Sequence, residues 1–395
     1  MRAWLARVLA SCVALSGPAL AVERLEAGVA ARADATQTYA LFVPANATST
    51  TPLLIVLDPR GRGRATLDLA LPHARERGWV VLSSDTSRSD TDEAVTGRAL
   101  GALMQELDRY PHDPRRVYLA GMSGTAKTLW VVAPKLRGRI AGFIAAGGAR
   151  PPELPPLRKE DALPWFGYAG TTDFNHREML AMDATLDALG TPHRLVLFDG
   201  PHGWPDSFGD AMAWLDLLAM RAGIATQDGA FIDARFAACG NDITSARDAL
   251  ERARRLDACI RDFDVLGDVA AWRAQRKALP IDADYRRLQA LDERLASEER
   301  RYLRRVDEWR LRFGTRFVEQ VQQPPMTLAD SLRMLQVATI RKHAHDPEPR
   351  VAESARRRLA WVHAAAAFYM PEYFRARGDD ARVQALHEIA DATMP

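Results

Sequence analysis

Three polar residues in this sequence have the types and the order that nucleophilic catalysis on an acyl group requires. Ser123 lies in the segment GMSG, Asp173 ends the segment GTTD, and His202 lies in the segment GPHGW. A serine hydroxyl is a weak nucleophile that needs an adjacent base, and a histidine base needs an acid that fixes its tautomer. The three residues therefore predict a triad with Ser123 as nucleophile, His202 as base and Asp173 as acid.

Each of these residues also has a purely structural interpretation. Ser123 fits an ordinary turn, Asp173 fits the cap of a following helix, and His202 fits an exposed loop. Their combination favours catalysis, because each follows an apolar run and the separations are 50 residues (123 to 173) and 29 residues (173 to 202). Two rivals remain: His176 as an alternative base or a substrate contact, and Asp199 as an alternative acid.

The segment around Ser123 predicts how the nucleophile is presented. The apolar run 116–120 enters it, and the helix-compatible run 125–132 leaves it. A strand, a sharp turn and a helix with serine at the apex form a nucleophile elbow, which exposes the serine Oγ near a helix N-terminus. The usual pattern is G-x-S-x-G, and Thr125 replaces its closing glycine. We expect a local packing departure there within a working site.

The remaining elements of residues 22–224 alternate between strand and helix. The strands are expected at 38–44, an edge strand, and at 53–57, 79–83, 116–120, 140–145, 164–169 and 194–198. The helices between and after them are expected at 64–77, 92–110, 125–132, 177–189 and 207–220. This alternation predicts an α/β fold with a doubly wound, mostly parallel sheet. The carboxyl ends of its strands share one rim, where the three candidate residues meet.

An acyl-transfer site also needs two N–H donors for the oxyanion. Gly124, directly after the nucleophile, is expected to supply one backbone N–H. The loop after the strand 53–57 is expected to supply the other, and its Pro59 has no N–H, so Arg60 is the candidate. The alternative is that Arg60 and Arg62 are ordinary surface charges.

Residues 225–395 have helical patterns and predict an all-α domain. Asp242 is expected to cap a helix that reaches Ile260, and Asp282 a longer helix with an apolar seam from Tyr285 to Phe313. This domain either shades the site or dimerises through the seam. The segment 366–395 resembles part of a tetratricopeptide-like helix pair, but no second copy follows, so an irregular helical domain is favoured.

An exported protein could join the two cysteines of this domain, but the predicted helices argue against such a bond. Cys239 is placed at a turn and Cys259 near the far end of the next helix. Twenty helical residues span about 30 Å, which is beyond disulfide reach unless the helix is broken. The Cys and His spacing does not fit zinc, so neither a metal nor a cofactor is expected.

The N-terminal sequence predicts where the protein is located, and the net charge bears on its partners. Residues 1–21 fit a secretory signal peptide, with Arg2 and Arg7 before an apolar run and an A-x-A-like cleavage site. The run is too short for a membrane anchor, and a lipoprotein box at Cys12 is the weaker alternative. We expect a periplasmic or secreted protein. The net charge of +2 over 395 residues gives no reason to expect a nucleic-acid partner.

With these motifs, residues 36–221 resemble an α/β-hydrolase, most closely the compact dienelactone-hydrolase-like and polyester-depolymerase-like esterases. The resemblance implies that Ser123, His202 and Asp173 hydrolyse a small carboxylic ester through an acyl-enzyme. The sequence departs from the family at Thr125. It also lacks the His-Gly motif that is common in esterases in the loop after the early strand, here 53–57. Two alternatives stay open: a serine peptidase of the prolyl-oligopeptidase type, and a non-catalytic binding protein whose helical domain contacts another protein.

Overall fold

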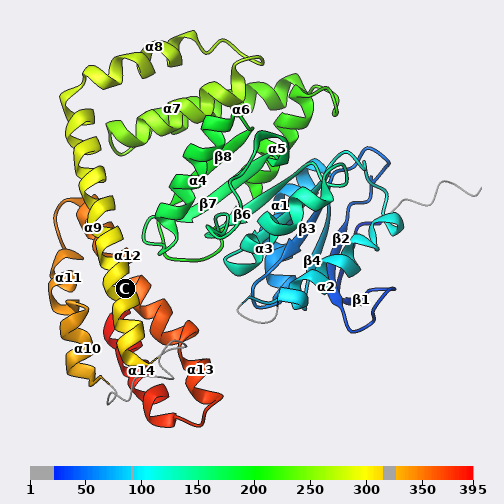
Figure 1. The fold of residues 1–395 in the computed structure, drawn as a ribbon. Helices are drawn as coiled ribbons and strands as arrows, with labels where there is room; N and C mark the ends of the chain where they lie inside the picture. The colour runs from blue at the N-terminus through cyan, green and yellow to red at the C-terminus, as the bar shows by residue number, and fades with distance from the viewer. Residues whose placement is uncertain (1–21, 90–92, 315–325, 395) are drawn as a thin grey trace, which may run out of the picture.

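The computed structural model describes residues 22–89, 93–314 and 326–394, and shows an α/β half (22–224) followed by a helical half (225–394) (Figure 1). The predicted signal peptide, residues 1–21, and the first residue of the predicted helix 92–110 lie outside the described residues. The strands are β1 (Arg24–Ala30), β2 (Thr38–Val43), β3 (Leu53–Leu57), β4 (Val80–Ser84), β5 (Val117–Met122), β6 (Gly142–Ala146), β7 (Trp165–Gly170) and β8 (His193–Phe198).

These strands form one sheet in the order β1-β2-β4-β3-β5-β6-β7-β8. Neighbouring strands from β4 to β8 are parallel, whereas β2 is antiparallel to both β1 and β4. The predicted fold class, a doubly wound and mostly parallel sheet followed by an all-helical region, is confirmed. The carboxyl ends of β5, β7 and β8 therefore lie along one rim, directly before Ser123, Asp173 and His202.

The edge of the sheet differs from the prediction. The segment 38–44 is not an edge strand, because β2 lies between β1 and β4 and its residues 39–43 are buried. The true edge, β1, has the sequence RLEAGVA and is exposed at most positions. A strand with so little buried apolar surface carries no period that a sequence pattern detects.

Helices cover both faces of the sheet (Figure 1). Side chains of α1 and α5 pack on one face, and side chains of α2, α3 and α4 pack on the other. The central strands β3 and β5 are buried along their whole lengths, which fits their continuous apolar sequences. The helices are α1 (Gly63–Arg77), α2 (Glu93–Met104), α3 (Gly124–Val132), α4 (His176–Leu189) and α5 (Gly209–Arg221).

The helical half extends along the β8 side of the sheet (Figure 1). Its helices are α6 (Gly229–Thr244), α7 (Ala249–Phe263), α8 (Ala270–Ala278), α9 (Ala283–Phe313), α10 (Leu328–Met334), α11 (Val337–His343), α12 (Pro349–Ala364), α13 (Pro371–Arg375) and α14 (Asp380–Thr393). Asp282 caps α9 as predicted, by accepting hydrogen bonds from the N–H groups of Asp284 and Tyr285. Among the described helices, none combines the length and the apolar character that crossing a membrane requires.

The predicted position of Cys239 at a turn is wrong, and the two cysteines form the bond that this position argued against. Cys239 lies in α6 and Cys259 in α7, their Cα atoms are 5.8 Å apart, and the two sulfur atoms form a disulfide. Asp242 does not cap a helix but lies inside α6, and Asp248 caps α7 through the Glu251 N–H. The segment CGN, which resembles a turn, is helical here because α6 packs its apolar face against α7.

The apolar seam of α9 is not free for self-association. Tyr302, Val306, Trp309 and Phe313 are buried against α11, α12, α13 and α14 of the same chain. The seam at Leu288 is likewise buried, in the cluster that α6 and α7 form. The period of the seam therefore reports intramolecular packing, which argues against the alternative that the chain dimerises through the seam.

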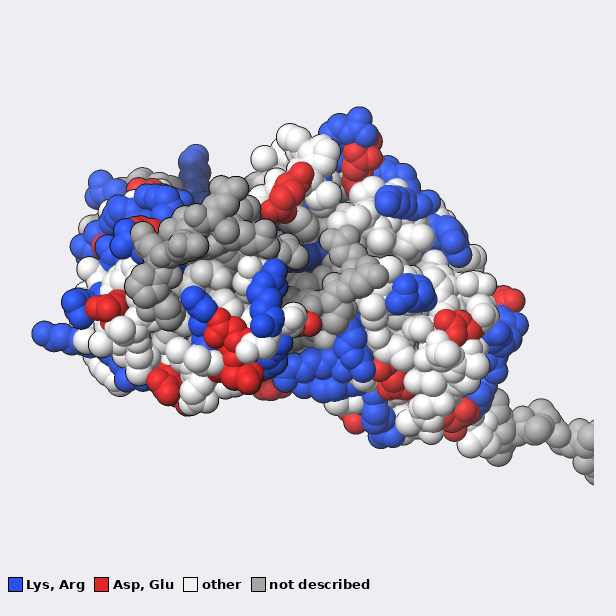
Figure 2. Space-filling view, turned by 60° about the horizontal axis from the view of Figure 1, so that its bottom comes forward, with Lys and Arg blue, Asp and Glu red and all other residues white. Residues whose placement is uncertain are grey.

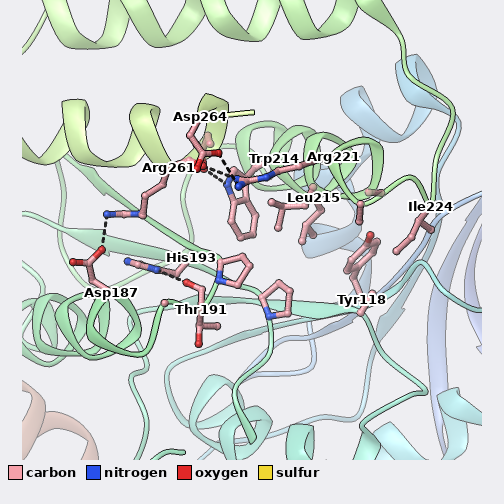
Figure 3. Close-up of a pocket in the computed structure, with 18 residues that line it drawn as sticks. Tyr118, Asp187, Thr191, His193, Trp214, Leu215, Arg221, Ile224, Arg261 and Asp264 are labelled. Carbon is pink, nitrogen blue, oxygen red and sulfur yellow. Dashed lines mark hydrogen bonds and ion pairs between the residues drawn. The ribbon is translucent and has the colours of Figure 1, made fainter. Parts of the chain in front are cut away.

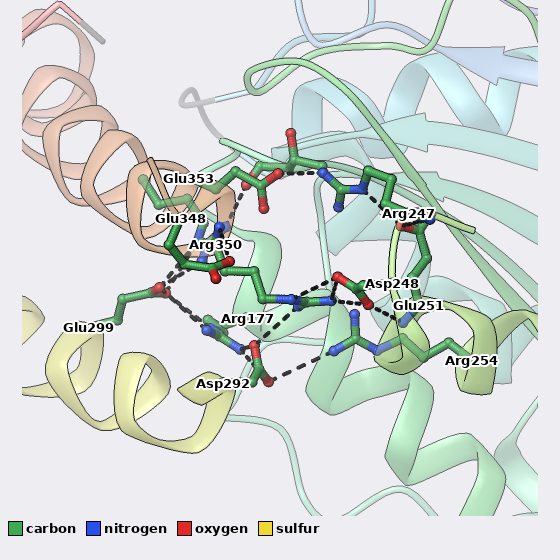
Figure 4. Close-up of polar contacts among 12 residues, drawn as sticks. Arg177, Arg247, Asp248, Glu251, Arg254, Asp292, Glu299, Glu348, Arg350 and Glu353 are labelled. Atoms are coloured by element: carbon green, nitrogen blue, oxygen red, sulfur yellow. Dashed lines mark hydrogen bonds and ion pairs between the residues drawn. The ribbon is translucent and has the colours of Figure 1, made fainter. Parts of the chain in front are cut away.

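An ion-pair network holds the two halves together (Figure 4). Arg177 of α4 contacts both Asp292 and Glu299 of α9, with N–O distances of 3.0 and 3.1 Å. Within the helical half, Arg350 of α12 extends the network, because it contacts Asp248 at the start of α7 (2.7 Å) and lies 3.9 Å from Asp292. These side chains are mostly buried, so the network fixes the helical half against α4.

Candidate active site

Ser123 occupies the sharp turn between β5 and α3. Its backbone has φ 54° and ψ −124°, and in the described ranges only one other non-glycine residue, Gln336, has a positive φ. The turn is tight: a Cβ added to Gly121 would lie 2.8 Å from the backbone nitrogen of Ala126. A serine held in this sparsely populated conformation matches the predicted nucleophile elbow.

Thr125 links two strands through hydrogen bonds of its hydroxyl and is not a packing defect. Its Oγ1 accepts a hydrogen bond from the Met122 N–H (2.9 Å) and lies 2.6 Å from the carbonyl oxygen of Leu57, to which it donates. The residue is fully buried. The hydroxyl thus joins the end of β3 to the end of β5 beneath the elbow, and the expectation of a packing departure is corrected.

We expect Thr125→Val to destabilise the protein by about 2–4 kcal/mol, because it leaves a buried N–H and a buried carbonyl without partners. Thr125→Ser keeps the hydroxyl and is expected to lose less than half of that amount. Urea unfolding of the two variants and the wild type measures the difference. Equal loss in both variants would show that the methyl group, and not the hydroxyl, matters.

Asp173 and His202 are brought together by the loops after β7 and β8. Nδ1 of His202 lies 2.9 Å from Oδ1 of Asp173, so the ring donates this hydrogen bond to the carboxylate and leaves Nε2 as an acceptor. Asp173 is fully buried, and its Oδ1 also accepts a hydrogen bond from the N–H of Asn175 at 2.7 Å. The Phe174 ring packs on the imidazole, with centroids 4.2 Å apart. Ser123 and His202 line one cavity of about 380 Å³.

The two rival residues are placed elsewhere. The Nδ1 of His176 lies 3.0 Å from the carbonyl oxygen of Gly170, and burial, helped by Arg357 and Arg177, holds its pKa well below the ordinary value. Asp199 accepts a hydrogen bond from the Thr171 hydroxyl. Neither residue lines the cavity of Ser123.

Two residues that the sequence did not single out lie against the pair formed by Asp173 and His202. Gly147, after β6, has φ 53°, and a Cβ on it would lie 2.7 Å from Oδ2 of Asp173 and 2.8 Å from Nδ1 of His202. The Nδ2 of Asn175 donates a hydrogen bond to the carbonyl oxygen of Gly147 at 2.7 Å. The glycine pair that follows the strand 140–145 was the available signal, since paired glycines often mark a close backbone approach.

The two predicted oxyanion donors differ in availability. Gly124 begins α3 directly after Ser123. The Arg60 N–H, however, donates to Oδ1 of Asp58 at 2.8 Å, so this candidate donor is already occupied. The hydroxyl of Ser89 is buried and has no hydrogen-bond partner within the described parts of the chain. A Cβ on Gly124 would lie 2.8 Å from that hydroxyl oxygen.

Asp58 organises the loop after β3. It is fully buried, pairs with Arg62, and accepts a hydrogen bond from the indole N–H of Trp204 at 2.9 Å. Burial raises its pKa, but the bonds from Arg62 and Trp204 outweigh burial and hold the pKa below the ordinary value. Because Trp204 follows His202 by two residues, this carboxylate ties the β3 loop to the histidine loop.

The helical half forms part of the cavity wall. Phe368 and Tyr369, from the π-helical turn Ala365–Tyr369 after α12, line the cavity with Ser123 and His202. Beside them, the Trp361 ring packs on Phe174, with centroids 5.4 Å apart. The helical half therefore shades the site, as one of the two sequence interpretations held, but through the end of α12 and not through α9.

A larger cavity, of about 570 Å³, lies at the other end of the sheet (Figure 3). Tyr118, Pro164 and His193, at the amino ends of β5, β7 and β8, contribute to its lining. Its residues include none of the three candidate residues. Among the residues that the structure describes, no group of three or more His, Cys, Asp or Glu side chains is arranged to hold a metal ion.

No family model matches this sequence, and no curated protein matches it. Similar solved structures are esterases and serine hydrolases of the α/β-hydrolase fold. An S-formylglutathione hydrolase from Staphylococcus aureus is 13% identical, with a TM-score of 0.39 over 50% of this chain and 98% of that chain. Esterase B from Lactobacillus rhamnosis is 16% identical, with a TM-score of 0.39 over 51% and 87%. Esterase 2 from Thermogutta terrifontis is 12% identical, with a TM-score of 0.38 over 53% and 98%.

Proposed function

We propose that this protein is a serine hydrolase that cleaves small carboxylic esters. The observation that carries the proposal is the hydrogen bond between His202 and the buried Asp173, in a cavity that His202 shares with Ser123. A histidine with a carboxylate on Nδ1 has its Nε2 free to accept a proton. The positive φ of Ser123 supports the same conclusion, because this strain has no evident role in packing.

In this mechanism, the Ser123 Oγ attacks the ester carbonyl while Nε2 of His202 accepts the hydroxyl proton. The tetrahedral intermediate collapses to an acyl-enzyme, and the protonated His202 donates its proton to the departing alcohol. Water then attacks the acyl-enzyme with His202 again as base, which releases the acid and restores Ser123. Asp173 keeps the imidazole in the required tautomer and stabilises its charged form.

The oxyanion of each intermediate needs two donors. We assign the first to the Gly124 N–H, at the start of α3, where the helix dipole also favours negative charge. We assign the second to the Ser89 hydroxyl, because it is buried beside Gly124 and has no partner among the described residues, whereas the Arg60 N–H is bonded to Asp58.

Export is part of the same proposal. The N-terminal sequence has the features of a signal peptide. The disulfide between Cys239 and Cys259 supports an oxidising compartment, because such bonds are rare in the cytosol. We infer a periplasmic or secreted enzyme. Fractionation of expressing cells tests this inference, and a protein retained in the cytosol with both thiols reduced would contradict it.

Covalent labelling with a fluorophosphonate probe, together with turnover of 4-nitrophenyl butyrate, tests the proposed reaction. The wild type is expected to label, and Ser123→Ala is expected not to. His202→Ala is expected to lose about 10²–10⁴-fold in kcat, and Ser89→Ala about 10²–10³-fold. His345→Ala, at an exposed position of the helical half, is the matched control. A wild type that neither labels nor turns over the ester would favour a non-catalytic binding protein.

A further inference from the structure

We propose that the ester substrate carries a carboxylate, which Arg60 and Arg88 bind, and an apolar or aromatic body, which Phe368 and Tyr369 hold. This inference rests on the proposed ester hydrolysis at Ser123 and names the substrate class of that site. Arg60, Arg88, Phe368 and Tyr369 all line the cavity of about 380 Å³ that contains Ser123.

The first observation is a concentration of positive charge. Among the described residues that line this cavity, two are arginines and none is a carboxylate. The guanidinium of Arg60 has one described contact, the Phe368 ring, with its carbon 6.0 Å from the ring centroid. Arg88 donates from Nη1 to the carbonyl oxygens of Ser87 and Asp85, at 2.7 and 3.2 Å. Neither has a carboxylate partner within the described ranges.

Two described carboxylates on the loops around the cavity already have partners. Asp58 is fully buried and pairs with Arg62, and Asp173 is fully buried behind His202. Elsewhere the chain pairs its arginines extensively with carboxylates, as the network of Figure 4 shows. In a space-filling view, Lys and Arg side chains, together with some Asp and Glu side chains, lie beside the hollow between the two halves (Figure 2).

The guanidinium of Arg88 is also held in position. It packs on the backbone of Gly61, next in sequence to Arg60, where an added Cβ would lie only 1.6 Å from its Nη1. Two guanidinium groups that line one cavity repel each other unless an anion lies between or beside them. Their placement around the nucleophile is therefore explained by an anionic ligand.

The second observation is a pair of exposed aromatic rings. Phe368 and Tyr369 are 50% and 40% exposed, and adjacent exposed aromatic rings, unlike single ones, favour a binding surface. They lie in the π-helical turn Ala365–Tyr369, a distortion that is frequent at functional sites. With Phe174, which packs against His202, they give the cavity a largely aromatic lining.

These features select a chemical class of ester. A guanidinium binds a carboxylate through two parallel hydrogen bonds, and aromatic walls bind a flat or apolar body. A cavity of this size is in the range of small-ligand sites. The substrate that fits is a half-ester: one end is the ester bond at Ser123, and the other end is a free carboxylate at Arg60 and Arg88.

Two chromogenic esters of equal chain length test this inference. 4-Nitrophenyl hydrogen glutarate carries the carboxylate, and its methyl ester is neutral. We expect the wild type to show at least a tenfold higher kcat/KM for the anionic ester at low ionic strength. The preference is expected to fall as salt rises, because the charges are exposed to solvent.

The double variant Arg60→Gln/Arg88→Gln is expected to lower the ratio of the two kcat/KM values at least tenfold. Arg60→Lys/Arg88→Lys, which keeps the charge, is expected to retain part of the ratio. Arg64→Gln, which removes an exposed arginine paired with Asp68, is the control that keeps the full ratio.

The outcomes separate the two proposals. Equal turnover of both esters by the wild type, or an unchanged ratio in the glutamine variant, overturns the substrate class but leaves ester hydrolysis intact. If neither ester is turned over and Ser123 does not label with a fluorophosphonate, the proposed function fails and this inference fails with it.

Discussion

Gly147→Ala is expected to lower kcat/KM for 4-nitrophenyl butyrate by about 10²–10⁴-fold, the range lost when a general base is displaced. The added Cβ would lie 2.7 Å from Oδ2 of Asp173 and 2.8 Å from Nδ1 of His202, closer than real contacts allow. Neither neighbour moves easily. Asp173 is fully buried and bonded to the backbone of Asn175, and His202 lies against Phe174.

The backbone strain of this substitution must be separated from the clash, since any side chain at a positive φ costs about 1–2 kcal/mol. Gly138→Ala provides that control: its φ is 78°, and no atom lies within 4 Å of the added Cβ. Gly147→Ala is expected to lose more stability than Gly138→Ala in urea unfolding, because the clash adds to the shared backbone strain, and only Gly147→Ala is expected to lose activity. Full activity in Gly147→Ala would show that the Asp173–His202 hydrogen bond is not needed for turnover.

The parts of the fold that the sequence predicted are those with a local signal. Continuous apolar runs identified the buried strands β3 and β5, and the alternation of strand and helix predicted a shared rim for Ser123, Asp173 and His202. The structure brings Asp173 within hydrogen-bond distance of His202, as that spacing implied. The assignment of chemical roles to the three residues stays a prediction until the variants are measured.

The features that sequence reasoning missed depend on contacts between distant segments. Thr125 looks like a defect in a motif until Leu57, 68 residues earlier, supplies the acceptor for its hydroxyl. Arg60 looks like an oxyanion donor until the side chain of Asp58 accepts its N–H. The edge strand β1 has too little buried surface to produce a period, and CGN in α6 resembles a turn.

The role of the helical half was the feature that the sequence predicted least, because this half reaches the site through contacts between residues that are far apart in the chain. Phe174 and Trp361 are far apart in sequence but pack together, with centroids 5.4 Å apart. The same α12 sends Arg357 to the carbonyl oxygen of Thr171 at 2.5 Å, two residues before Asp173. The helical half therefore forms part of the cavity wall and also supports the loop that carries Asp173.

Glu299→Ala is expected to destabilise the protein by about 3–5 kcal/mol, because it leaves buried positive charge unpaired. Glu299 of α9 accepts hydrogen bonds from Arg357 and Arg177 at 2.8 and 3.1 Å, and its side chain is only 7% exposed. Without it, the two guanidinium groups repel each other where α9, α12 and α4 meet. Activity is expected to fall as well, because Arg357 then holds Thr171 less firmly. Glu298→Ala, one residue away in a longer and more exposed ion pair, is the matched control and is expected to lose under 1 kcal/mol.

The same carboxylate is expected to make the wild type acid-sensitive. Burial raises the pKa of Glu299, but Arg357 and Arg177 outweigh burial and hold the pKa below its ordinary value of 4.5. A lowered pKa in the folded state means that ionised Glu299 stabilises the fold above about pH 4.5, and that this contribution is lost as pH falls through the folded pKa. Between pH 7 and pH 3.5, the free energy of unfolding measured in urea is therefore expected to fall less for Glu299→Ala than for the wild type. An equal fall in the free energy of unfolding of both proteins would show that other carboxylates of the chain cause the acid sensitivity.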